Sequence, residues 1–174
     1  LAARYDDALT VAESAIETIC RFRLDFAIPY ALCPAATAAA GRRQWTTANA
    51  LVEEALRSAR SARNAYAEHI CVATTIRILA QQGRHQAALA VEIPELSASL
   101  PSATSEVLAS RALVLASSSR LGEASALVDE ARGASSAIEP TVLIAAAEAI
   151  DGGPRRAHTP TTVSQTRQTG MKTF

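Results

Sequence analysis

The segment that decides the fold is Gly83-Arg84-His85-Gln86-Ala87-Ala88, in which a turn residue and polar residues lead into alanine. The same pattern recurs at residues 3–8, 43–48 and 119–124. The alanines that end the four segments are Ala8, Ala48, Ala88 and Ala124. They are spaced by 40, 40 and 36 residues, a period typical of helical repeat arrays.

Small or aliphatic residues recur at fixed distances from these four alanines. Steps of four and seven residues keep side chains on one face of a helix, so each repeat is predicted to contain two helices with facing small-residue stripes. The third repeat departs from the pattern seven residues after its alanine, where Glu95 follows Pro94. The recurring positions are Ala15, Ala55 and Ala131, then Ala40, Ala80 and Ala116, then Ala36, Ile76 and Ala112, and finally Leu32, Val72 and Leu108.

The pattern predicts an all-α fold, a right-handed stack of antiparallel helix hairpins. Glycine commonly follows the last turn of a helix, so Gly41, Gly83 and Gly133 are expected to close helices. Pro94 is expected to shorten one helix, and Pro34 to kink its helix or move its start. The predicted helices span residues 3–20, 27–40, 45–61, 64–82, 84–93, 102–118, 121–133 and 139–150.

Two regions of different composition divide the chain. Residues 1–150 are predicted to form the helical repeat domain, since alanine is the best helix former and aromatic residues are only 4% of the chain. Residues 151–174 are rich in threonine, basic in net charge and without a hydrophobic period, so we expect a disordered tail. The formal net charge of the whole chain is zero, and the tail is net positive, so the repeat domain is net negative. A domain without excess positive charge has no electrostatic footprint for nucleic acid.

The three cysteines, Cys20, Cys33 and Cys71, are odd in number and lack CxxC spacing, which argues against a disulfide framework. Cys71 lies between Ile70 and Val72 and is predicted to be a small core residue. No apolar run reaches the length of about 18 residues expected of a membrane span, and no signal peptide is recognised. We expect a protein of the reducing cytoplasm. Because the sequence begins at Leu1, we also expect a fragment or a processed product.

The turn, basic residue, polar residue and alanine pattern resembles the tetratricopeptide family over residues 1–150. The long, Ala- and Arg-rich repeats look like the sensor region of large ATP-binding LuxR-type (MalT-like) bacterial transcriptional regulators. Residues 135–140, followed by an Ala/Leu helix, are similar to the end of that region. The resemblance implies a non-catalytic module that binds a protein or a small effector. The alternative is a free-standing tetratricopeptide-like adaptor for assembling protein complexes.

Residues able to carry catalysis or bind metal are scattered. His69 and Cys71 are two residues apart on a predicted helix, so their side chains diverge and do not share a metal ion. Glu13 and Glu17 lie near arginines, as on a solvated helix face. We therefore predict no metal, no cofactor and no enzymatic activity. An all-helical enzyme, the third hypothesis, would require polar residues that converge in one pocket.

A ligand-binding surface is predicted on the concave face of the stack. In tetratricopeptide-like stacks the first helix of each pair lines this face, where partners often bind. The candidate residues on these helices are Tyr66, His69, Arg77 and Arg111. The alternative interpretation is that they are ordinary solvated helix residues. The expected partner is a protein or a small effector, with neither a membrane nor directly bound nucleic acid.

Overall fold

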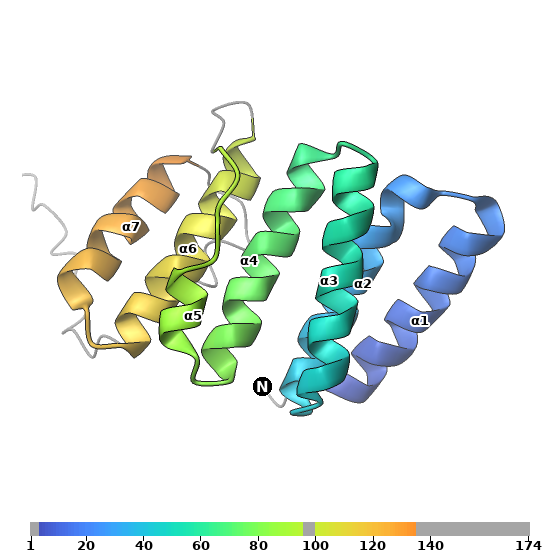
Figure 1. The fold of residues 1–174 in the computed structure, drawn as a ribbon, viewed down its shortest axis with the longest axis horizontal. Coiled ribbons are helices and arrows are strands. Elements are labelled where there is room, and N and C mark those ends of the chain that lie inside the picture. The colour runs from blue at the N-terminus through green and yellow to red at the C-terminus, as the bar shows by residue number, and fades with distance from the viewer. Residues whose placement is uncertain (1–3, 96–99, 135–174) are drawn as a thin grey trace, which may run out of the picture.

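Helices make up all the regular structure of residues 4–95 and 100–134, the part of the chain described by this computed structural model (Figure 1). Those residues contain seven α-helices and one short 3₁₀-helix, as the sequence predicts for an all-α protein. The helix expected at residues 139–150 and the tail at 151–174 lie outside the described residues. The elements are α1 (Tyr5–Phe22), η1 (Asp25–Ala27), α2 (Ile28–Gly41), α3 (Trp45–Ser61), α4 (Ala65–Gln81), α5 (His85–Leu89), α6 (Pro101–Ser117) and α7 (Leu121–Ala134).

Most helix boundaries fall within two residues of their predicted positions, and α5 is the exception. It ends at Leu89 and not near residue 93. The guanidinium of Arg111 donates from Nη2 to the carbonyls of Leu89 and Val91, at 3.0 and 3.2 Å, and so satisfies backbone groups that a longer helix would use. Pro94 further disfavours a helical conformation for the residue before it.

The helix ends share one backbone motif that the sequence did not reveal. A residue in the left-handed conformation follows each of five helices, and only one of the five is glycine. After α2, for example, Arg43 N–H donates to Ala40 and Gln44 N–H to Ala39, the paired bonds of a Schellman motif. The five left-handed residues are Arg23, Arg43, Arg63, Gly83 and Ser119.

Gly41 and Gly133 were also expected to close helices, but neither has the left-handed conformation seen at Gly83. Gly41 is the last residue of α2, but the left-handed residue is Arg43. A Cβ atom at Gly41 would overlap the ring of Tyr5 on α1, so a larger residue there would require the ring to move. Gly133 lies inside α7, which continues to Ala134. Pro34 does not move the start of its helix. Helix α2 begins at Ile28, one residue from its predicted start, and continues through the proline.

The helices lie side by side, and each packs against its neighbours along the chain (Figure 1). In sequence order α1 packs on α2, α2 on α3, α3 on α4, α4 on α6 and α6 on α7. The short α5 packs against both α4 and α6, and α2 also contacts α4 directly. No helix among the described residues has the length and apolar character needed to span a membrane.

Most of the small-residue positions predicted from the repeat lie in the core, but Ala8 is exposed, and Ala15 and Ala80 are half-buried. Ala48, Ala88, Ala55 and Ala131 are fully buried, which allows the helix backbones to approach closely. Helices α2, α4 and α6 are buried on more than one face, whereas α1 buries only Ala12 and Ile19. Helices α2, α4 and α6 follow one another through the molecule, α3 and α5 cover them on one side, and α1 and α7 lie at opposite ends (Figure 1).

Candidate ligand groove

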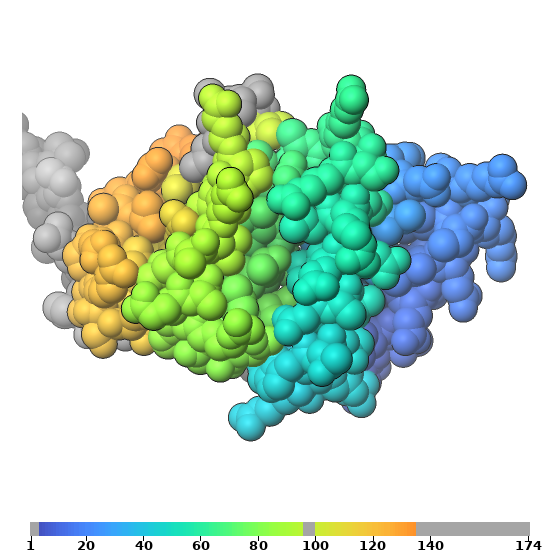
Figure 2. All heavy atoms as spheres, viewed as in Figure 1, coloured from blue at the N-terminus to red at the C-terminus, as the bar shows by residue number. Residues whose placement is uncertain are grey.

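A groove of about 980 Å³ lies between α1, α2, α4 and α6. Helices α2 and α4 supply most of its wall, because side chains spaced three or four residues apart lie along one face of each helix. Figure 2 views the molecule from the side of α3 and α5, two helices that contribute nothing to this groove. The lining residues are Arg4, Tyr5, Ala8, Tyr30, Cys33, Pro34, Thr37, Ala38, Tyr66, Ile70, Thr74, Arg77, Ala80, Gln81, Leu113 and Ser117.

Two tyrosines stand at one end of the groove, near the starts of α2 and α4. The ring centroids of Tyr30 and Tyr66 are 6.3 Å apart, with an angle of 36° between the ring planes. Asn64 Nδ2 donates to the Tyr30 hydroxyl at 3.2 Å, and Ser102 Oγ donates to the Tyr66 hydroxyl at 3.4 Å. Polar contacts thus hold both hydroxyls, and the two rings contribute aromatic surface to the groove lining.

Arg77 lines the middle of the groove, but its charge is paired within the protein. Its Nη1 lies 2.8 Å from Glu106 Oε1 and 3.4 Å from Ser110 Oγ, and its Nη2 donates to Thr74 Oγ1 at 3.0 Å. The side chains of Arg77 and Glu106 are only 13% and 4% exposed. A buried pair of this kind neutralises both charges, so the groove offers hydrogen bonds from its wall but no free cation at this point.

Cys33 and Cys71 meet at the contact between α2 and α4, with their Sγ atoms 3.6 Å apart. Cys33 is part of the groove wall, and Cys71 lies fully buried behind it. The pKa of Cys33 is lowered, chiefly by its hydrogen bond with the Cys71 thiol. The pKa of Cys71 is raised by the same hydrogen bond and by burial.

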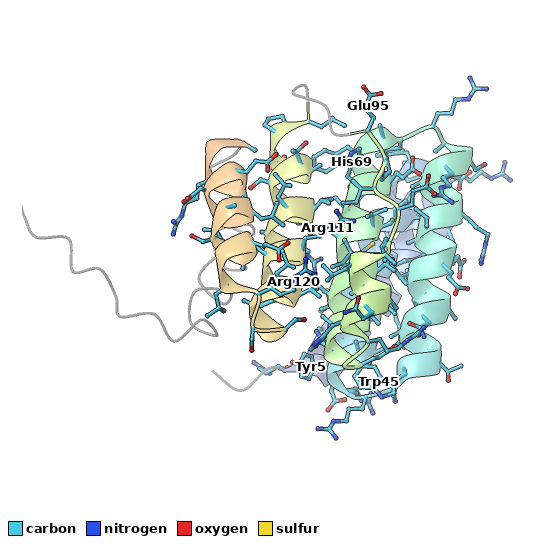
Figure 3. The ribbon with its side chains drawn as sticks, turned by 60° about the vertical axis from the view of Figure 1, so that its left-hand side comes forward. Tyr5, Trp45, His69, Glu95, Arg111 and Arg120 are labelled. Atoms are coloured by element: carbon cyan, nitrogen blue, oxygen red, sulfur yellow. The ribbon has the colours of Figure 1, made fainter. Side chains whose placement is uncertain are left out.

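The predicted site residues divide into two pairs. Tyr66 and Arg77 line the groove, whereas His69 and Arg111 do not. Arg111 on α6 is committed to the carbonyls that follow α5, and Figure 3 shows it apart from His69. These two residues belong to the packing between helices.

His69 is buried on another face of α4. Its Nδ1 lies 2.7 Å from the Ala65 carbonyl and so donates a proton to it, and the ring is only 2% exposed. Its Nε2 has no hydrogen-bond partner among residues 4–95 and 100–134. Within the same residues no group of three or more His, Cys, Asp or Glu side chains is placed to hold a metal ion.

The α2 side of the groove was missed by reasoning from the sequence. Tyr30, Cys33 and Thr37 recur at steps of three and four residues, a spacing that places them on one helix face and could have located them. No family model matches the chain, and neither a curated protein nor a solved structure matches it.

Proposed function

We propose that this chain is a non-catalytic binding module whose groove holds a small, largely apolar effector. The observation that carries the proposal is the groove of about 980 Å³ between α1, α2, α4 and α6. Pockets for small ligands commonly occupy about 300–1,000 Å³ and combine an apolar wall with a few polar groups. This groove has that composition, with alanine, isoleucine and leucine side chains beside hydroxyl, amide and guanidinium groups.

The lining favours an uncharged ligand with an aromatic or planar apolar part. Tyr30 and Tyr66 offer ring faces at one end, and Thr37 and Gln81 offer hydrogen bonds further along. The guanidinium of Arg77 is already paired with Glu106, so a carboxylate or phosphate ligand would have to compete with a buried internal partner.

We further propose that the helices form a right-handed, tetratricopeptide-like stack within a cytoplasmic bacterial regulator of the LuxR type. The repeat period of 36–40 residues supports this proposal, as do the left-handed residues Arg23, Arg43, Arg63 and Gly83, which recur every 20 residues. In such a regulator the bound effector would bias the contacts of this module with its neighbouring domains. The proposed LuxR-type regulator is tested by reading the coding sequence on either side of this segment. Further repeats and a GxxxxGK[ST] phosphate loop are expected there.

A free-standing adaptor is the second candidate, and one surface favours it. Phe22, Leu24 and Phe26, at the connection between α1 and η1, are 63%, 40% and 61% exposed. Clustered exposed apolar side chains mark protein interaction sites more often than single ones do. In this case the partner would be a protein docked at the end of α1, and the groove could remain empty.

The groove is tested with Nile red, an uncharged apolar dye, as the probe. Ala8 is an exposed alanine of α1 that lines the groove, and Ala50 is an exposed alanine of α3 outside it. We expect saturable dye fluorescence with the unsubstituted chain. We expect Ala8→Trp to weaken dye binding by at least about ten-fold, since the indole fills part of the groove, and Ala50→Trp to leave it unchanged.

Equal loss in both variants would contradict the groove as a binding site, as would fluorescence that never saturates. The adaptor is tested separately by replacing Phe22 and Phe26 with serine. If those substitutions abolish capture of a protein partner while dye binding persists, the adaptor is favoured over the effector-binding module.

A further inference from the structure

Cys33 and Cys71 are 38 residues apart in the chain and adjacent in space. Their Sγ atoms lie 3.6 Å apart at the contact of α2 with α4, in a buried cluster that also contains Ala67 of α4 and Ala55 and Ala59 of α3. Both thiols are free. Cys20, the third cysteine, lies exposed on α1.

We propose that Cys33 and Cys71 form a peroxide-sensitive dithiol that closes into an intramolecular disulfide between α2 and α4. Cys33 lines the groove and is 4% exposed, so the groove is the side from which a small hydroperoxide reaches it. Cys71 does not line the groove and has no exposed surface. The geometry thus assigns different parts to the two thiols, with Cys33 as the attacking thiol and Cys71 as the resolving thiol.

The chemistry balances with one hydroperoxide as the oxidant. The Cys33 thiolate attacks the terminal peroxide oxygen, the O–O bond breaks, and the alkoxide or hydroxide leaves as alcohol or water after taking a proton. The Cys33 sulfenic acid then reacts with Cys71, the S–S bond forms, and the sulfenic oxygen leaves as water with the Cys71 proton. In sum two thiols lose two electrons, and the peroxide is reduced.

The surroundings favour this order of events. The hydrogen bond between the two thiols is the main cause that lowers the pKa of Cys33, and the neighbouring Thr74 and Arg77 contribute to the shift. A disulfide requires an S–S distance of about 2.05 Å, so the sulfur atoms must approach by about 1.5 Å from their present separation. The sulfur atoms come together only if α2 and α4 shift slightly against each other. The new bond would join the two helices that form most of the groove wall.

The test uses the full chain carrying Cys20→Ser, which removes the exposed thiol. After treatment with hydrogen peroxide, we expect the intact mass to fall by two hydrogens. We expect peptide mapping to yield one linked pair containing Cys33 and Cys71, which dithiothreitol separates. Denatured in urea, the same chain should form this link at least about ten-fold more slowly, because folding no longer holds the sulfur atoms together.

Two further substitutions distinguish the attacking thiol from the resolving thiol. With Cys71→Ser, oxidation should stop at a Cys33 sulfenic acid that dimedone captures. With Cys33→Ser, the buried Cys71 should remain a thiol, and circular dichroism checks that both variants stay helical. The proposal is overturned if peroxide leaves both thiols intact in the Cys20→Ser chain or takes Cys33 to the sulfinic acid without a link. Equally fast cross-linking of the denatured chain would also overturn it.

Discussion

The centre of the molecule, from α4 to α6, and its edge at α1 both carry the repeat alanine but differ in how deeply it is buried. Ala88 near the centre is fully buried, whereas Ala8 on α1 is exposed and lines the groove. The ion pairs differ in the same way. Arg77–Glu106 is buried between α4 and α6, while Arg42–Asp6, between α2 and α1, is 43% and 83% exposed. A residue's position in the repeat therefore does not determine its energetic contribution, because that depends on how many helices surround it.

The largest expected effect comes from breaking the central ion pair. Glu106→Ala would leave the Arg77 charge buried without its carboxylate, at a cost of about 3–5 kcal/mol in the free energy of unfolding. Urea denaturation at neutral pH measures this loss. Asp6→Ala is the matched change at the edge and should cost less than about 1 kcal/mol, because the Arg42–Asp6 pair is exposed to solvent. Similar losses in the two variants would show that centre and edge do not differ as described.

An intermediate effect is expected from enlarging equivalent alanines of the repeat. Ala48→Leu adds volume to a fully buried position and should destabilise the fold by about 1–3 kcal/mol. Ala8→Leu adds the same atoms at an exposed position and should change stability by less than about 0.5 kcal/mol. Thermal unfolding of the two variants side by side measures the contrast. A large loss in Ala8→Leu would mean that α1 is as tightly surrounded as α3.

The smallest effects concern the helix ends, where centre and edge should behave alike. Gly83 after α4 has φ of 73°, so Gly83→Ala should cost about 1 kcal/mol. Arg23 after α1 has φ of 54°, and Arg23→Gly should stabilise by less than about 1 kcal/mol, since glycine's greater freedom in the unfolded chain offsets part of the relieved strain. Calorimetry detects both shifts. If the Arg23 change destabilises the fold, the left-handed conformation there is stabilised by contacts of the arginine side chain.

The sequence alone predicts the described helices and most of the buried alanines of the repeat, although not on α1, where Ala8 is exposed. Both follow from local properties, namely alanine's helix propensity and the three- and four-residue steps around Ala48, Ala88 and Ala124. The sequence predicted that Pro94 shortens α5, but not that the helix ends as early as Leu89, where its backbone carbonyl accepts from Arg111, more than 20 residues further along the chain. The left-handed arginines escaped it because a Schellman turn is closed by backbone hydrogen bonds, which any residue can form at some cost in strain.

Which polar residues face the groove depends on how the helices pack against one another. Tyr66, His69 and Arg77 lie on one helix, yet α4 is surrounded by α2, α3, α5 and α6, so its faces point to different neighbours. Tyr66 and Arg77 face the groove, and His69 faces the core. The meeting of Cys33 with Cys71 was equally beyond prediction, because a sulfur–sulfur distance between two helices depends on how closely they pack and how they are rotated. Periodicity along one chain specifies a buried stripe, but it carries no information on the rotation of one helix against the next.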